Sequence, residues 1–145
     1  MKLAVIRIRG MWGIKPKIKT TMEKLNLTRV NHCVIINDAP TYIGMLKICK
    51  DYVAYGPISN KMIEKLITKR ARKAGNKKLE KEENEKVPDF VERFVQEKAD
   101  IKNLGIKPVF RLKPPKKGYK SIKKAYPRGA LGKWPSMDIL INKMI

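Results

Sequence analysis

The first part of the chain contains three short stretches with a strand-like hydrophobic pattern. Residues 2–9 alternate with a period of two and include β-branched side chains, which predicts a strand ending at Arg9–Gly10. Shorter apolar runs at 33–36 and 52–55 predict two further strands, because turn-forming residues follow each of them.

Between these strands, apolar residues recur every three or four positions, as on one face of a helix. The first helix is predicted to begin at Pro16, which suits a first helical turn, or at Thr20, which opens a capping box. The second is predicted to follow Thr41 as its N-cap, with a buried stripe formed by Tyr42, Met45, Leu46 and Cys49. This order predicts a three-stranded sheet with two right-handed crossovers and its helices on one face or on both.

The middle of the chain is predicted to be helical. Ser59 or Asn60 is expected to cap one amphipathic helix, and Pro88 opens another that should end near 103–105. Between them, residues 74–86 contain one large apolar residue within a run of mixed charge. That segment is either a solvated helix or a mobile linker.

The C-terminal third combines short ordered elements with a long basic loop. Residues 109–112 predict a strand, and Ser136 is expected to cap a final helix with an apolar docking face. The intervening residues 113–135 are rich in Lys, Pro and Gly, contain no acid, and cannot bury a core of their own. Because an ordered helix follows, both ends of the loop should be held against the body.

The charge of the chain indicates what kind of partner it binds. The 145 residues include 34 Lys+Arg and 13 Asp+Glu, for a net charge of +21. Residues 1–56 contribute +7, residues 57–100 only +3, and residues 101–145 contribute +11. This uneven distribution of positive charge indicates a phosphate-binding face and not a uniformly basic surface. No apolar run is long enough for a membrane span, so no membrane partner is expected.

The sequence offers no catalytic constellation. His32 adjoins Cys33, but neighbouring residues on a strand point to opposite faces, so a Cys–His nucleophile is not expected. Cys33 and Cys49 show no metal-ligand or disulfide spacing, which predicts a reduced, cytoplasmic protein. Phosphate-binding glycine motifs are absent. We therefore expect no enzyme activity, no cofactor, no metal and no small-molecule substrate.

Two loops are candidates for RNA contact. The loop Gly10–Pro16 (GMWGIKP) is either a plain strand–helix turn with surface lysines or a phosphate seat formed by backbone N–H groups among cations. Trp12 is either packed over the sheet edge or offered for stacking. Residues 113–135 are either a disordered basic tail or a binding loop, and the interleaved aromatics Tyr119, Tyr126 and Trp134 favour binding.

Several of these segments together resemble a known family. The glycine spacing of GMWGIKP, the segment Thr21–Val34 (TMEKLNLTRVNHCV) and the segment Pro40–Leu46 (PTYIGML) are similar to the large-subunit ribosomal protein thirty family. The later helix-rich part and Phe110–Gly118 (FRLKPPKKG) resemble its archaeal form, which is related to the eukaryotic protein called seven-e. The likeness covers nearly the whole chain.

The resemblance implies an α+β fold with a ferredoxin-like βαβαβ body. The expected regions are this RNA-binding body (1–56), a helical segment (57–105), and a basic C-terminal extension with a short terminal helix (106–145). The implied partners are large-subunit rRNA and neighbouring ribosomal proteins on a cytoplasmic ribosome. The resemblance also leaves open a contact with the smallest rRNA. The alternative from charge alone is a nucleic-acid chaperone or DNA-compacting protein outside the ribosome.

The candidate RNA-binding residues follow from the loops, the charge and the resemblance. They are Arg7, Arg9, Gly10, Trp12, Gly13, Lys15, Lys17, Lys19, Arg29, Asn31, Arg70, Arg72, Lys73, Lys113, Lys116, Lys117, Tyr119, Lys120, Lys123, Lys124, Arg128, Lys133 and Trp134.

Overall fold

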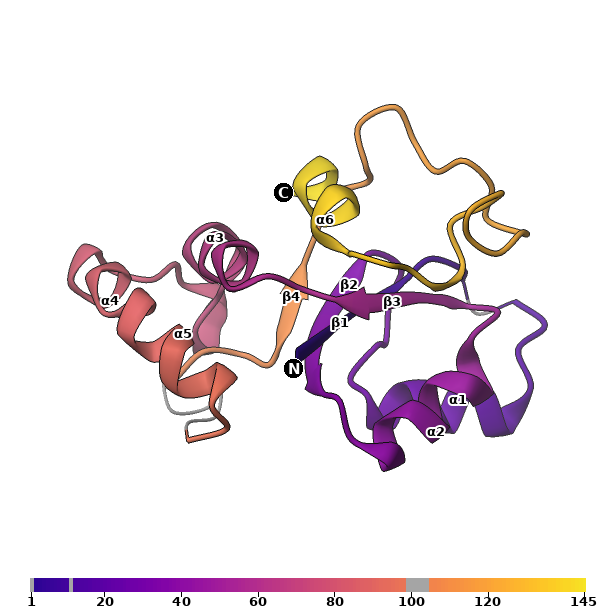
Figure 1. The fold of residues 1–145 in the computed structure, drawn as a ribbon, viewed down its shortest axis with the longest axis horizontal. Helices are drawn as coiled ribbons and strands as arrows, with labels where there is room; N and C mark the ends of the chain where they lie inside the picture. Colours follow the sequence, from indigo (N-terminus) through magenta and orange to yellow (C-terminus); the bar gives the residue numbers. More distant parts are fainter. Residues whose placement is uncertain (1, 11, 99–104) are drawn as a thin grey trace.

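A five-stranded sheet organises the molecule (Figure 1). The computed structural model describes residues 2–10, 12–98 and 105–145. In spatial order the strands are β4 (Val109–Arg111), β2 (His32–Asn37), β1 (Lys2–Arg7), β3 (Val53–Pro57) and β5 (Gly132–Lys133). With its helices, the chain has an α+β architecture.

The sheet corrects the predicted topology. The prediction was three strands joined by two crossovers, but β1 lies between β2 and β3 and is antiparallel to both. Only the path from β2 to β3 joins parallel strands, and β1 separates them. The C-terminal third adds an edge strand on each side, with β4 antiparallel to β2 and β5 parallel to β3. Hydrophobic periodicity identifies strands, but it does not fix their order in space.

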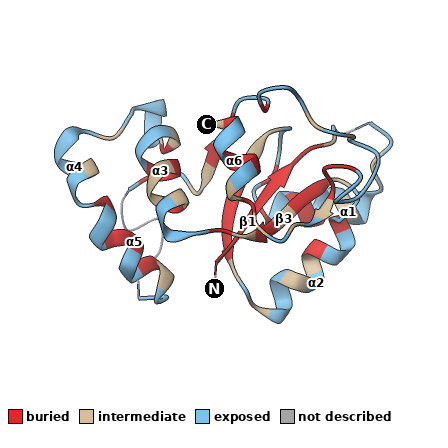
Figure 2. Cartoon of the chain, turned by 45° about the horizontal axis from the view of Figure 1, so that its top comes forward, coloured by how far each residue is buried: buried red, intermediate tan, exposed pale blue. Residues whose placement is uncertain are grey.

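Helices cover both faces of the sheet because β1 is apolar on both. Leu3 and Val5 face α1 (Pro16–Lys24) and α2 (Pro40–Cys49). Ala4 and Ile6 belong to the opposite core, which also includes residues of α3 (Asn60–Arg70), α5 (Val87–Val95) and α6 (Asp138–Met144). All six residues of β1 are buried, and Figure 2 shows the strand enclosed between helices.

The helix starts follow local capping chemistry. Helix α1 begins at Pro16, so the alternative start at Thr20 is wrong; the Thr20 hydroxyl donates to Pro16 O within the helix. Helix α2 begins at Pro40 after Ala39, and not after Thr41 as predicted, because Pro occupies the first turn. Tyr42 was expected in the buried stripe but is exposed.

Helix α3 is capped as expected, since Ser59 Oγ accepts from Met62 N at 3.3 Å. The mixed-charge segment, predicted to be either a solvated helix or a mobile linker, forms a 3₁₀ turn (Ala74–Asn76) and the short helix α4 (Lys81–Glu85), which has no buried residues. Helix α5 ends at Val95, earlier than predicted, and Glu97 then adopts a φ of 61°. Residues 103 and 104 of the predicted end lie outside the described residues.

The last helix docks with the predicted face. Its N-cap, however, is Met137 and not Ser136 as predicted, because α6 begins at Asp138. Ser136 Oγ accepts from Asp138 N at 3.4 Å just before the helix. Its buried side chains include Leu140, Ile141 and Met144, which join the core on that face of the sheet. Within the described residues, no helix has the length and apolar character needed to cross a bilayer.

Replacing Gly56 with Ala is expected to destabilise the protein by about 1–3 kcal/mol. A Cβ at this position in β3 would lie 2.6 Å from Trp134 O, in the backbone segment that pairs with β3. The measurement is the free energy of unfolding from urea titration. Gly44→Ala in α2 is the matched control, because its Cβ would meet nothing within 4 Å and Ala favours helix. Equal stability of the two variants would contradict the packing argument.

Candidate nucleic-acid interface

The antiparallel order gathers several loops at one edge of the sheet. Strands β1 and β4 end there, while β2, β3 and β5 begin there. We call this the loop edge, and it comprises residues 8–15, 28–31 and 112–131, of which residue 11 is outside the described part. The last segment leaves from β4 on one side of the sheet and returns to β5 on the other, as the long loop in Figure 1 shows.

The glycine loop presents cations and an aromatic ring to solvent. Trp12 is 99% exposed, so it does not pack over the sheet edge. Gly13 adopts a φ of 68°, which favours glycine. The Arg9 guanidinium lies 5.2 Å from the centre of the Tyr52 ring. No side chain caps α1 at Lys15, so its first N–H groups remain open to an anion.

Arg7 is a correction to the candidate set. It was predicted at the RNA surface, but it is 1% exposed, because β1 is central and covered on both faces. Its Nη1 donates to Leu27 O at 2.8 Å and its Nε to Arg9 O at 3.0 Å. Burial lowers the pKa of Arg7. The Arg7 side chain therefore connects β1 to the backbone at Arg9 and Leu27 in the interior of the protein.

The loop before β2 lies against the C-terminal segment. Asn31 adopts a φ of 66°, and its Oδ1 accepts from the Tyr119 hydroxyl at 2.8 Å. Arg29 is exposed beside it. The pKa of His32 is lowered first by burial and then by the positive charges of Arg111, Arg29 and Arg7. The His32 side chain therefore lies close to a cluster of positively charged side chains.

Neither cysteine is prepared for catalysis. Burial raises the pKa of the Cys33 thiol to about 12 and that of Cys49 to about 11, so both remain protonated near neutral pH. Both side chains are in the hydrophobic core. Across the described residues, no cluster of three His, Cys, Asp or Glu could hold a metal ion.

The basic loop is anchored at several points and is not a free tail. The N–H groups of Lys113 and Lys116 donate to Met144 O and Lys143 O at 3.1 Å. Further along, Ala130 N donates to Ser121 O at 2.9 Å. The loop's candidate cations are exposed: Lys113, Lys116, Lys117, Lys120, Lys123, Lys124 and Arg128, with Lys133 following in β5.

The aromatic residues of the loop have internal partners as well as exposed surface. Trp134 Nε1 donates to Ala130 O at 2.8 Å. The rings of Tyr126 and Trp134 have centroids 4.6 Å apart with a 38° interplanar angle. Tyr119 and Trp134 are half-buried, whereas Tyr126 is 38% exposed. The candidate role of Tyr119 and Trp134 therefore includes shaping the loop.

Three other candidates lie apart from the loop edge. Arg70 ends α3, which Figure 1 places on the helical side of the molecule, and its Nη2 donates to Ile145 O at 3.1 Å. Arg72 Nη1 donates to Ala71 O at 3.0 Å, and Lys73 pairs with Glu83. These cations are half-buried and already have internal partners.

Sequence reasoning missed two cations. Arg111 ends β4 opposite His32 in the register and is exposed at the loop edge. It is the one charged residue within the predicted strand 109–112, and that was the signal that could have identified it. Lys143 lines a cavity between α6 and the basic loop. No local motif marks Lys143, because only the folded loop brings it to that site.

Replacing Tyr119 with Phe is expected to lower the free energy of unfolding by about 0.5–1.5 kcal/mol, because Asn31 loses its donor. Burial raises the pKa of Tyr119 from 10.0 to about 12. The folded state thus keeps its phenol proton longer than the unfolded state, and wild-type stability should fall as pH rises between those values. Ultraviolet titration of phenolate should show a late component that is absent in Tyr119→Phe. A wild-type titration without a late component would contradict this.

Known proteins are similar in sequence to this chain over most or all of its length. The family described as Ribosomal protein L30p/L7e matches residues 3–53. "Large ribosomal subunit protein uL30" of Archaeoglobus fulgidus is 47% identical over 136 residues, covering 89% of this chain and 90% of that protein. The Methanococcus maripaludis protein of the same name is 45% identical over an alignment of 154 positions, which covers 100% of both chains. Identity of this extent shows that the chain belongs to the ribosomal protein L30p/L7e family.

Proposed function

We propose that the chain binds and stabilises folded rRNA in the large ribosomal subunit through its loop edge. Membership in the family makes it a structural, non-enzymatic protein of that subunit. The observation that supports RNA binding is the convergence of three exposed basic segments at one edge of the sheet. Cations there neutralise backbone phosphates and supply affinity, while the fixed shape of the loops selects the RNA site.

Each part of the loop edge has a distinct role in this proposal. The open N–H groups at the start of α1 and the cations from Lys15 to Lys19 contact phosphates. Trp12 stacks on an unpaired base. Arg9, Gly10, Gly13, Arg29, Asn31 and Arg111 form the middle of the surface, and the cations of residues 113–133 extend it.

The finer organisation is also proposed. Residues 1–56 would act as a ferredoxin-like RNA-binding body, residues 57–105 as a helical segment, and residues 106–145 as a basic extension. The cations Arg70, Arg72 and Lys73 would form a second contact, to the smallest rRNA or to a neighbouring ribosomal protein. Their separation from the loop edge supports a distinct partner.

Binding to purified large-subunit rRNA tests the main proposal. We expect the affinity for rRNA to fall steeply as the salt concentration rises. We also expect that excess duplex DNA does not displace the rRNA. A nucleic-acid chaperone or DNA-compacting protein would instead bind duplex DNA of any sequence with similar strength. Equal competition by duplex DNA would contradict the proposal.

Replacing Lys116 and Lys117 with Ala is expected to flatten the salt dependence of rRNA binding. Each lost phosphate contact should reduce the slope of log K against log salt by roughly 0.7–0.9. Filter binding across a salt series measures this slope. Lys81→Ala/Lys86→Ala, two exposed lysines at α4, removes equal charge away from the loop edge. An unchanged slope in the first variant would remove residues 116–117 from the interface.

A further inference from the structure

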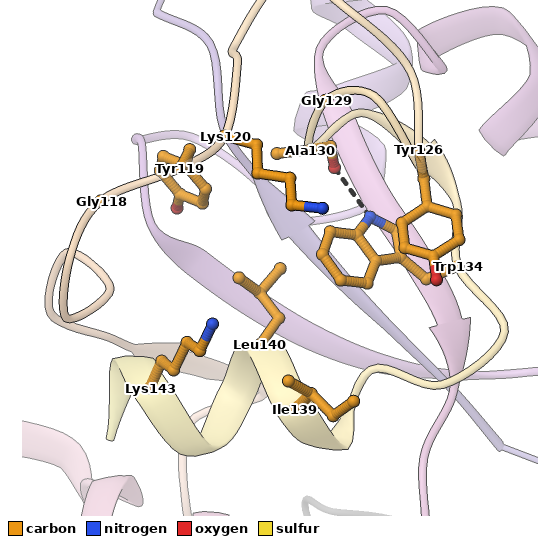
Figure 3. Close-up of a pocket in the computed structure, with 10 residues that line it drawn as sticks. All are labelled: Gly118, Tyr119, Lys120, Tyr126, Gly129, Ala130, Trp134, Ile139, Leu140 and Lys143. Carbon is orange, nitrogen blue, oxygen red and sulfur yellow. Dashed lines mark hydrogen bonds between the residues drawn. The ribbon is translucent and has the colours of Figure 1, made fainter.

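Between the basic loop and α6 lies a cavity of about 240 Å³ (Figure 3). It is smaller than the pockets that hold drug-sized ligands, which span about 300–1,000 Å³, so it suits a single ring system. Aromatic residues form much of its lining: Tyr119, Tyr126 and Trp134. Leu140 of α6 lies below them in the view.

The lining also carries charge of one sign. Lys120 comes from the loop and Lys143 from α6, and Figure 3 shows both side chains extending toward the space between Tyr119 and Trp134. None of the ten lining residues is acidic. An aliphatic side chain from another protein would gain nothing from these ammonium groups, whereas a nucleotide offers both a ring and a phosphate.

The polar atoms of the walls narrow the choice of ligand. The Tyr119 hydroxyl donates to Asn31 and Trp134 Nε1 donates to Ala130. Lysine ammonium groups can only donate hydrogen bonds. A base edge rich in acceptors, such as O6 and N7 of guanine, therefore complements the lysines.

We propose that this cavity, the aromatic pocket, binds one unstacked nucleobase of the rRNA, with its phosphate near Lys120 or Lys143. The pocket deepens the proposed rRNA binding and rests on it. Phosphate contacts at the loop edge would hold the RNA in place, and the pocket would recognise a single base that leaves the stack. The pre-formed contact between Tyr126 and Trp134 gives that base a fixed aromatic wall.

Guanosine 5′-monophosphate is the probe, and Trp134 fluorescence is the readout. Trp12→Phe leaves Trp134 as the single indole, since the chain has two Trp residues. We expect saturable quenching by the nucleotide and none by ribose 5-phosphate at equal ionic strength. Equal quenching by ribose 5-phosphate would overturn the pocket as a base site and leave an anion site only.

Tyr126→Ala should weaken nucleotide and rRNA binding at least fivefold, because one stacking face is lost. The salt slope of rRNA binding should not change, since no charge is removed. Tyr42→Ala is the matched control, because Tyr42 is 36% exposed and Tyr126 38% exposed. Lys143→Ala is a second variant that leaves the Tyr126–Trp134 contact intact, and it should also weaken nucleotide binding.

The outcomes separate the pocket from the wider proposal. Wild-type rRNA binding with a steep salt slope, but without any effect of the nucleotide or of Tyr126→Ala, would overturn the pocket alone. Loss of a neighbouring ribosomal protein from subunits carrying Tyr126→Ala, at unchanged rRNA affinity, would assign the pocket to a protein side chain and likewise overturn it. Absence of rRNA binding by the wild-type chain would overturn both proposals.

Discussion

Combined replacement of Lys15, Lys17, Lys19 and Arg29 with Ala is expected to weaken rRNA binding by about 100- to 1,000-fold near physiological salt. All four side chains are exposed on the loop edge or on the first turns of α1 beside it. At each phosphate contact that is lost, the RNA keeps the counterions that binding would otherwise release. The slope of log K against log salt should therefore also fall by roughly 3. Filter binding with large-subunit rRNA at several salt concentrations measures both quantities.

The control for this variant removes the same charge elsewhere. The control replaces four exposed lysines: Lys61 in α3, Lys77 after the 3₁₀ turn, Lys81 in α4 and Lys86 at its end. Helices α3 and α4 lie on the other side of the molecule from α1 (Figure 1). If net charge alone drives binding, the two quadruple variants should lose equal affinity. A distinct interface predicts that the control keeps nearly the whole wild-type slope. Equal losses would contradict the loop edge as the binding surface.

Phe110→Ala is expected to lower the free energy of unfolding by about 3–5 kcal/mol. Phe110 is fully buried in β4, opposite Cys33 in the register. It belongs to the core on the face of the sheet covered by α3, α5 and α6. Removing the ring would leave a cavity that a neighbouring strand cannot fill by collapse. Urea unfolding followed by circular dichroism measures the change.

Ile48→Ala provides the comparison for Phe110→Ala. Ile48 is 37% exposed on α2, so its loss should cost less than about 1 kcal/mol. A small effect of Phe110→Ala would mean that β4 is peripheral to the fold. A large effect would establish that the C-terminal third is an integral part of the sheet, even though it is also the most basic part.

The sequence predicted the elements of the first 57 residues because their hydrophobic periods are strong. It did not predict that β1 is central, since alternation identifies a strand without naming its neighbours. The burial of Arg7 follows from that central position, and sequence alone placed Arg7 at the surface. Strand β5 has two residues and no pattern of its own, so only the return of the basic loop to β3 reveals it.

Candidate contact residues divided in the same way. The exposed cations of the glycine loop and of residues 113–133 could be predicted from charge and turn chemistry. Tyr119 and Trp134 have roles that depend on contacts with residues far away in the sequence, namely Asn31 for Tyr119 and β3 for Trp134. Such contacts have no local signature, which is why Lys143 was also missed.

The placement of the edge strands has a consequence for biosynthesis. When residues 1–57 have emerged from a translating ribosome, β2 and β3 each have one unpaired edge, because β4 and β5 are still to be made. Open edges pair readily with other chains. A nascent chain stalled before residue 109 should therefore be prone to aggregation and depend on chaperones, and release from that state should coincide with completion of β4 and β5.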